Sequence, residues 1–194
     1  MSALAKTIVA TGVSSGLGFE AIKQLLQQTQ PYRVILGARN AEGAQKAFGD
    51  LKFDESKHNV TVLPLELADL RGVKTFAQQT LETLGQQKID YVLLNAAISN
   101  SAEEPGPHGS KWCESYIVNH LYHRNEALTW AKGAENILRA LERDDLPEDP
   151  EQIFLTSWGE WWPKEVYAQT LDKKLQDKWC LDKEQIEQEE GITA

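Results

Sequence analysis

The first part of the chain alternates short apolar runs with segments of helical spacing. The apolar runs occupy residues 6–12, 33–39, 59–67 and 89–97. Between them, apolar positions recur every three or four residues, which predicts helices over residues 16–29, 40–50 and 69–85. Near-continuous apolar strands separated by helices are typical of a parallel sheet covered on both faces. We therefore predict an α/β fold with a doubly wound, Rossmann-like parallel sheet.

The pattern changes after residue 97. A polar stretch rich in proline and glycine covers residues 99–110, and helical spacing returns over 112–123 and 125–143. The run QIFLTSW (152–158) suggests a short strand, and the charged tail after Pro163 suggests helix. We expect residues 1–124 to form the dinucleotide-binding half of the fold. Residues 125–194 would form a C-terminal cover of the same domain, with the sheet incomplete on its C-terminal side.

Composition narrows the class of protein. The chain has 194 residues and a net charge of −9, which argues against nucleic acid or an anionic membrane as partner. It has two cysteines, no secretory signal and no apolar run near the roughly 20 residues of a membrane span. We expect a cytoplasmic protein. Cys113 and the histidines at 108, 120 and 123 fit no common zinc spacing, so we predict no metal site.

The segment TGVSSGLG (11–18) follows a predicted strand and opens a predicted helix. In that context Gly12 permits a tight turn, Gly16 leaves room for a phosphate and Gly18 allows close packing of the helix. The helix start offers free amides and a positive dipole end, and Ser14 and Ser15 add hydroxyl donors. We predict a nucleotide phosphate site here. The alternative is a glycine turn without a ligand.

Three motifs together resemble the short-chain dehydrogenase/reductase family. They are the Thr-Gly-x-x-x-Gly-x-Gly spacing of residues 11–18, LNAA (94–97) and YIVNH (116–120). The last of these is similar to the family's retinol-dehydrogenase-like and protochlorophyllide-reductase-like branches. The resemblance implies a Rossmann-like fold and hydride transfer between a nicotinamide cofactor and a small carbonyl or alcohol substrate.

The resemblance also implies roles for individual residues. Glu66, with Leu67 beside it, falls where the family usually has an aspartate that meets the adenine amino group. Asn119 would match the asparagine that holds a proton-relay water. Asn95 and Ala96 would lie beside the adenosine ribose. The loop residues implied to wrap the pyrophosphate, with Ser15 as an added donor, are Gly12, Ser14, Ser15, Gly16, Leu17 and Gly18.

The second predicted strand ends in Arg39. NAD enzymes of this fold carry an acid near this point, which accepts hydrogen bonds from the ribose 2′-hydroxyl. An arginine can instead pair with a 2′-phosphate. We therefore expect NADP(H) as the cofactor, the alternative being that Arg39 is only a surface charge.

The catalytic pair of the family is missing. Its members use a tyrosine with a lysine four residues later, because a free tyrosine with a pKa of about 10 is a poor acid–base group near neutrality. None of the five tyrosines has a lysine at that spacing. Ser157 and Tyr167 could stand in for the catalytic residues, with 152–158 as the fifth strand. Alternatively, the chain after residue 124 resembles the C-terminal end of a longer relative and the catalytic segment is absent, which we favour.

We thus expect an NADP(H)-binding oxidoreductase of this family whose catalytic competence is in doubt. The alternative is a non-catalytic nucleotide-binding or regulatory protein. A third possibility is poor folding. Loss of central strands would leave a sheet edge and an apolar helix face exposed, which would favour aggregation or pairing with another chain, a homo-oligomer being one such outcome.

Overall fold

The computed structural model describes residues 4–97, 130–152, 154–155, 160–179, 183–189 and 191. It divides into two compact units, Met1–Glu135 and Asn136–Ala194. The predicted boundary at residues 124 and 125 lies outside the described residues, so that division stays a prediction. Among the residues described, no helix is long and apolar enough to cross a membrane.

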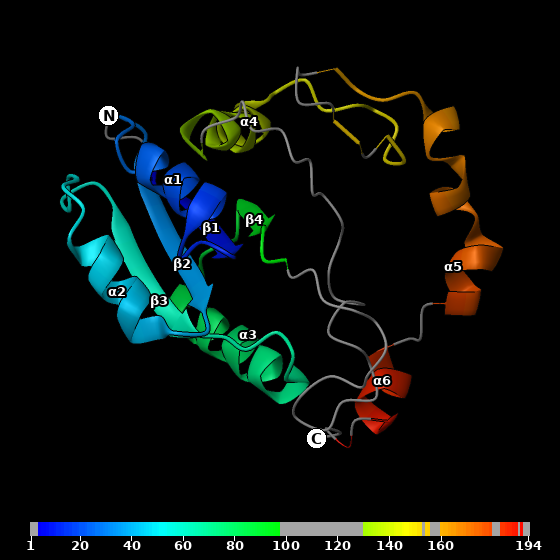
Figure 1. Cartoon of the computed structure of the whole chain (residues 1–194), viewed down its shortest axis with the longest axis horizontal. Helices are drawn as coiled ribbons and strands as arrows, with labels where there is room; N and C mark the ends of the chain where they lie inside the picture. Colours follow the sequence, from blue (N-terminus) through cyan, green and yellow to red (C-terminus); the bar gives the residue numbers. More distant parts are fainter. Residues whose placement is uncertain are drawn as a thin grey trace. The chain divides into compact units, whose positions relative to one another are not determined.

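The first unit is built on a parallel sheet of four strands, β1 (Lys6–Thr11), β2 (Tyr32–Ala38), β3 (Asn59–Pro64) and β4 (Tyr91–Leu94). Their order across the sheet is β3-β2-β1-β4 (Figure 1). All three strand pairs are parallel, and the sequence order reverses between β1 and β4. The predicted Rossmann-like α/β fold is confirmed.

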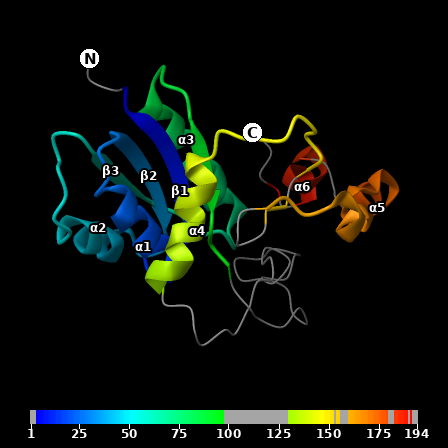
Figure 2. The same cartoon turned by 90° about the horizontal axis from the view of Figure 1, so that it is seen from above.

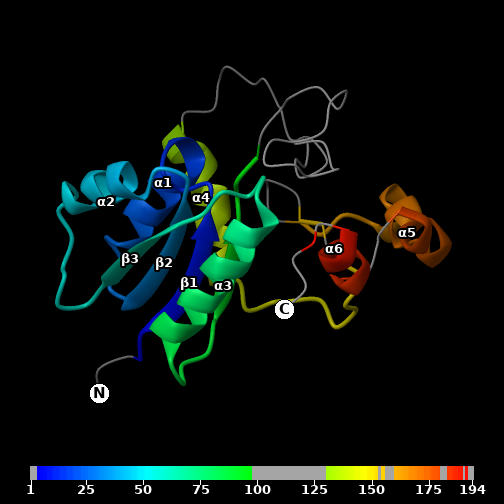
Figure 3. The same cartoon turned by 90° about the horizontal axis from the view of Figure 1, so that it is seen from below.

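Three helices connect these strands, α1 (Gly16–Leu25), α2 (Ala41–Gly49) and α3 (Leu70–Leu84). Figures 2 and 3 show α1 and α2 on one face of the sheet and α3 on the other. Asn40 and Asp69 cap α2 and α3, because each side chain accepts a backbone hydrogen bond from the first turn. Gly85, with a φ of 62°, ends α3.

The core follows the alternation of side chains along the strands. Val9 and Ile35 are buried against Phe76 and Leu84 of α3 in one hydrophobic cluster. The intervening residues Ile8, Val34 and Leu36 point to the opposite face and are fully buried. Burial of large apolar side chains on both faces stabilises the sheet at its centre.

β4 is an edge strand of the described sheet and is poorly covered. The side chains of Val92 and Leu94, two residues apart and therefore on one face, are 57% and 79% exposed. On its inner side β4 pairs with β1 from Ile8↔Tyr91 to Thr11↔Leu94. Within the described residues, the sheet is therefore open on the side of β4, as the sequence predicts.

In its described residues, the second unit consists mainly of short helices and irregular segments. The helix α4 (Trp130–Glu142) leads into it, and 3-10 turns (Lys164–Val166 and Ala168–Leu171) precede α5 (Lys173–Trp179) and α6 (Lys183–Glu189). In the predicted strand 152–158, Leu155 makes only an isolated antiparallel bridge with Trp161. The expectation of a fifth strand at 152–158 is therefore not met in the described part of this segment, because Leu155 pairs locally and not with the parallel sheet.

Candidate functional site

A pocket lies at the carboxyl ends of the parallel strands. Four segments contribute to its walls, each at or just after the carboxyl end of a strand. In open α/β sheets, ligands bind at this end, beside the point where the strand order reverses. The lining residues are Thr11, Gly12, Ser14, Ser15, Gly37, Ala38, Arg39, Leu65, Glu66, Leu67, Ala68, Asn95, Ala96 and Ala97.

The glycine loop adopts a backbone that needs glycine at two positions. Gly12 and Gly16 have φ values of 66° and 61°, in the left-handed region that other residues rarely adopt. A Cβ atom on Gly12 would lie 2.4 Å from the backbone nitrogen of Ala96, whereas one on Gly16 would meet nothing within 4 Å. Gly12 thus lets two loops touch, while Gly16 faces open space at the start of α1.

The first turn of α1 is suited to bind an anion. Ser15 is the N-cap, yet its side chain makes no capping hydrogen bond, and the first turn contains no acidic residue. Ser14 and Ser15 are exposed on the pocket wall. The unsatisfied amides and the dipole of the helix favour negative charge at this position. Gly16, Leu17 and Gly18 continue from the loop into the helix and are not among the lining residues.

Asn95 connects the end of β4 to the glycine loop. Its Nδ2 donates a hydrogen bond of 2.7 Å to the carbonyl oxygen of Gly12. The backbone nitrogen of Ala96 donates to Thr11 Oγ1 at 3.4 Å. These two contacts hold the loops after β1 and β4 together, so that both form one wall of the pocket.

The pocket carries one positive and one negative side chain. Arg39 is exposed at the end of β2 and forms no hydrogen bond or ion pair with any described residue. Glu66, after β3, accepts a hydrogen bond from the backbone nitrogen of Ala68 at 3.1 Å through Oε1. Leu67 packs against the hydrophobic cluster under α3. Arg39 is therefore free to bind an anionic ligand, whereas Glu66 is oriented by its own turn.

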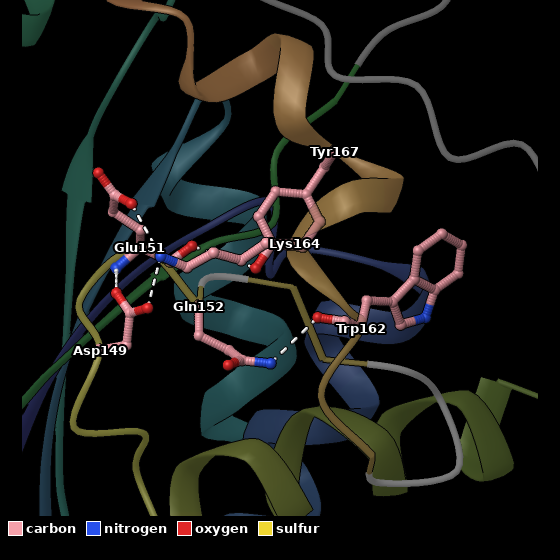
Figure 4. Close-up of polar contacts among 6 residues, drawn as sticks. All are labelled: Asp149, Glu151, Gln152, Trp162, Lys164 and Tyr167. Atoms are coloured by element: carbon pink, nitrogen blue, oxygen red, sulfur yellow. Dashed lines mark hydrogen bonds and ion pairs between the residues drawn. The ribbon is translucent and has the colours of Figure 1, made fainter.

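Of the three catalytic candidates, Asn119 and Ser157 lie outside the described residues, as do Cys113 and the three histidines considered as metal ligands. Tyr167 is buried in the second unit with 6% of its surface exposed. Its hydroxyl donates to the carbonyl oxygen of Glu151 at 3.1 Å (Figure 4). Its ring stands edge-on to Phe154 at 4.9 Å between centroids. These contacts give Tyr167 a structural role in its unit.

Lys164, three residues before Tyr167, is bound to two carboxylates. Its Nζ lies 2.5 Å from Asp149 Oδ2 and 2.8 Å from Glu151 Oε2 (Figure 4). The hydrogen bonds to Asp149 and then Glu151 raise the pKa of Lys164 above its ordinary value. Lys164 thus pairs with Asp149 and Glu151, whereas the Tyr167 hydroxyl bonds to a backbone carbonyl. The two side chains therefore do not form the family's tyrosine–lysine pair.

Six lining residues are not among the predicted site residues, although Thr11 and Ala97 lie within the motifs that predicted the site. The positions that sequence reasoning missed are Thr11, Gly37, Ala38, Leu65, Ala68 and Ala97. All six lie within four residues of the carboxyl end of a parallel strand, and the ends of neighbouring parallel strands share one edge of the sheet.

Comparison with known proteins identifies the family. A family model described as short chain dehydrogenase matches residues 6–121. A short-chain dehydrogenase/reductase of Talaromyces stipitatus is 34% identical over 116 residues, which cover 59% of this chain and 42% of that protein. Retinol dehydrogenase 13 of Homo sapiens is 26% identical over 118 residues, covering 61% of this chain and 34% of that protein. The chain therefore spans less than half the length of these two relatives.

A third relative matches along nearly its whole length. A short-chain dehydrogenase/reductase of Pestalotiopsis microspora is 40% identical over 286 aligned positions, covering 95% of this chain and 98% of that protein. Because this chain has only 194 residues, about 100 of the aligned positions are occupied in the relative and have no counterpart in this chain. These positions lie inside the alignment, since it extends over nearly the whole of both chains. Together with the family match over residues 6–121, this similarity shows that the chain belongs to the short-chain dehydrogenase/reductase family.

Proposed function

We propose that the chain binds NADP(H) in the pocket at the carboxyl ends of β1 to β4 and does not reduce carbonyls by the family's tyrosine–lysine route. One observation carries the proposal. The pocket combines an open glycine loop with Arg39, which has no hydrogen-bond or ion-pair partner among the described residues. Yet none of the five tyrosines in the chain is followed four residues later by a lysine.

The residues present fit the cofactor. The open space over Gly16 and the hydroxyls of Ser14 and Ser15 suit the pyrophosphate. Arg39 suits a 2′-phosphate, because a guanidinium forms charge-assisted hydrogen bonds with phosphate oxygens. Asn95 and Ala96 would flank the adenosine ribose, and Glu66 with Leu67 would lie near the adenine. When bound, the nicotinamide supplies or accepts a hydride.

The case against turnover rests on the missing proton donor. A tyrosine near neutral pH needs a neighbouring cation to act as an acid. Tyr167 donates its hydroxyl to a backbone carbonyl, and Lys164 is paired with Asp149 and Glu151. The roughly 100 positions that the Pestalotiopsis relative has and this chain lacks are enough for the catalytic strand and helix. This number supports the interpretation that the chain lacks the family's catalytic segment.

The second candidate function is an active oxidoreductase that acts on a small carbonyl or alcohol through Ser157 and Tyr167. Membership of the family favours it. The ten-residue separation of these two residues and the position of Tyr167 outside any α-helix oppose it. Cytoplasmic location and self-association of the chain stay predictions.

The test has a binding part and a turnover part. Isothermal titration calorimetry of the purified chain with NADPH should give saturable binding. Absorbance of NADPH should then stay constant when a panel of aldehydes and ketones is added. Turnover above the protein-free rate would refute the claim about catalysis, and absence of NADPH binding would refute the claim about the pocket. The variant Lys46→Gln, which changes an exposed residue of α2 outside the pocket, is the control and should bind NADPH as the wild type does.

A further inference from the structure

The pocket is confined to one half of a dinucleotide-binding sheet. Resting on the proposed function, we infer that the site recognises only the 2′-phosphorylated adenosine diphosphate part of its ligand. The group beyond the pyrophosphate then adds nothing to affinity. The chain would therefore bind oxidised and reduced NADP and their nicotinamide-free fragment equally well.

The first support is the origin of the lining residues. They fall in four short segments, 11–15, 37–39, 65–68 and 95–97. A complete dinucleotide sheet has two mononucleotide-binding halves, with strand order 3-2-1-4-5-6. The described sheet has the order β3-β2-β1-β4, which is one full half and the first strand of the other. The adenosine half of the site is present, and the described residues supply no further strand beyond β4.

The second support is the chemistry of the two sides of the pocket. On the β2 and α1 side lie groups that bind phosphate, namely the guanidinium of Arg39 and the hydroxyls of Ser14 and Ser15. On the β4 side, Asn95 already donates its Nδ2 to the carbonyl of Gly12. Ala96 and Ala97 follow it and have no side-chain donor or acceptor. In the described part of the pocket, the side chains of Ala96 and Ala97 thus offer no hydrogen-bonding group to the neutral carboxamide of a nicotinamide.

The third support is the alignment with the Pestalotiopsis relative. The family match of this chain ends at residue 121, and about 100 positions of that relative have no counterpart within this chain. A missing stretch of this size is large enough to hold the second mononucleotide half, since each strand–helix–strand unit takes about 30 residues. The alignment and the described sheet therefore both indicate a half-site, that is, a site with the adenosine half of a dinucleotide pocket and without the nicotinamide half.

The affinity would then come from the phosphates. Charge-assisted hydrogen bonds to the 2′-phosphate and the pyrophosphate are among the strongest polar contacts in proteins. They are identical in NADPH, NADP⁺ and 2′-phospho-ADP-ribose, the last of which is NADP⁺ without its nicotinamide. A site that makes only these contacts does not distinguish the three ligands.

The experiment compares five ligands by isothermal titration calorimetry on the full chain: NADPH, NADP⁺, 2′-phospho-ADP-ribose, ADP-ribose and nicotinamide mononucleotide. The first three should have dissociation constants within about threefold of one another. ADP-ribose should bind about tenfold more weakly, because it lacks the phosphate that Arg39 would hold. Nicotinamide mononucleotide should show no binding in the same concentration range.

The outcomes separate the two proposals. If 2′-phospho-ADP-ribose binds more than about tenfold more weakly than NADPH, the half-site is refuted while the proposed nucleotide function stands. If no ligand binds, the proposed function is refuted and the half-site with it. As a second measurement, Arg39→Gln should weaken NADPH and 2′-phospho-ADP-ribose by the same factor and leave ADP-ribose unchanged. Unequal losses would also overturn the inference.

Discussion

Asn95 Nδ2 donates a 2.7 Å hydrogen bond to the carbonyl oxygen of Gly12, joining two loops separated by 83 residues of chain. A Cβ atom on residue 18 would lie 2.3 Å from that same carbonyl oxygen. The Gly12 carbonyl is therefore held by the loop after β4, and it lies so close to the first turn of α1 that residue 18 has no room for a side chain. The shape of the glycine loop depends on this hydrogen bond and on this close approach.

Replacing Asn95 with alanine should loosen this loop. The change leaves the Gly12 carbonyl without its donor, which lowers the free energy of unfolding by about 1–3 kcal/mol. NADPH binding should weaken in parallel, because the two loops share one wall of the pocket. Urea unfolding and calorimetry measure the two effects. Asn59→Ala, at an exposed position on β3, is the control and should change neither; equal effects of both variants would contradict the role of Asn95.

Gly18→Ala should disrupt the same carbonyl from the other side. The new methyl group would lie 2.3 Å from the Gly12 oxygen and 2.6 Å from Asn95 Nδ2, so backbone must move. We expect a loss of stability of about 1–3 kcal/mol, as for other overpacked sites. Gly49→Ala, where the added Cβ meets nothing within 4 Å, should instead stabilise α2 slightly. A Gly18→Ala protein as stable as the wild type would show that this packing is not needed.

Arg39→Asp should reverse the cofactor preference. A carboxylate repels a 2′-phosphate and accepts hydrogen bonds from a ribose 2′-hydroxyl. The dissociation constant of NADPH should rise by at least about tenfold and that of NADH should fall. Calorimetric titrations with both cofactors provide the measurement. Should the NADPH affinity stay the same, Arg39 would be only a surface charge.

Asp90 should make stability depend on acid pH. Its Oδ2 accepts a 2.8 Å hydrogen bond from the Thr7 backbone nitrogen, and this bond, with Lys88 nearby, holds the pKa of Asp90 below its ordinary value. A depressed pKa in the folded state stabilises the protein above the unfolded value of about 3.9, and this contribution is lost as pH falls through the folded pKa.

The corresponding variant is Asp90→Asn. At pH 6 it should be about 1–2 kcal/mol less stable than the wild type, and the difference should shrink below about pH 4. Urea unfolding between pH 3 and pH 6 measures this trend, with the exposed Asp50→Asn as control. A difference that stays constant with pH would mean that Asp90 is not linked to folding in this way.

Tyr167→Phe distinguishes a structural tyrosine from a catalytic one. Loss of the hydroxyl that donates to Glu151 should lower the stability of the second unit by about 1 kcal/mol. Tryptophan fluorescence can follow this, since Trp161 and Trp162 lie in the same unit. NADPH binding should be unchanged. Measurable aldehyde reduction by the wild type that disappears in this variant would make Tyr167 the proton donor after all.

Most of the first unit is predictable because its central strands, β1 and β2, are buried on both faces and give near-continuous apolar runs. Apolar runs at 6–12, 33–39 and 59–67 correspond to β1, β2 and β3, and the caps of α1 and α3 lie at Ser15 and Asp69. The fourth run, 89–97, is strand only from Tyr91 to Leu94, because the chain leaves the sheet at Asn95 to meet the glycine loop. The spacing of apolar residues does not predict that the strand ends at Leu94, because that end depends on a contact with a loop 83 residues earlier in the chain.

Other features depend on hydrogen bonds between a side chain and the backbone that the residue types alone do not predict. Glu66 Oε1 accepts from its own backbone turn at Ala68, which the family resemblance does not suggest. His58 is buried at the start of the sheet, where its Nδ1 accepts a hydrogen bond of 3.3 Å from the backbone nitrogen of Tyr32. Both arrangements are set by tertiary packing, which overrides what the residue types favour on their own.

The pairing of β1 with β4 has a consequence for biosynthesis. β1, β2 and β3 are all synthesised before residue 65, but the pocket also needs Asn95, Ala96 and Ala97. A growing polypeptide can therefore assemble three strands on the ribosome well before it can hold a nucleotide. Once β4 has joined, a bound ligand stabilises the completed sheet by mass action. Nucleotide availability in the cell would then influence how long the newly made protein survives.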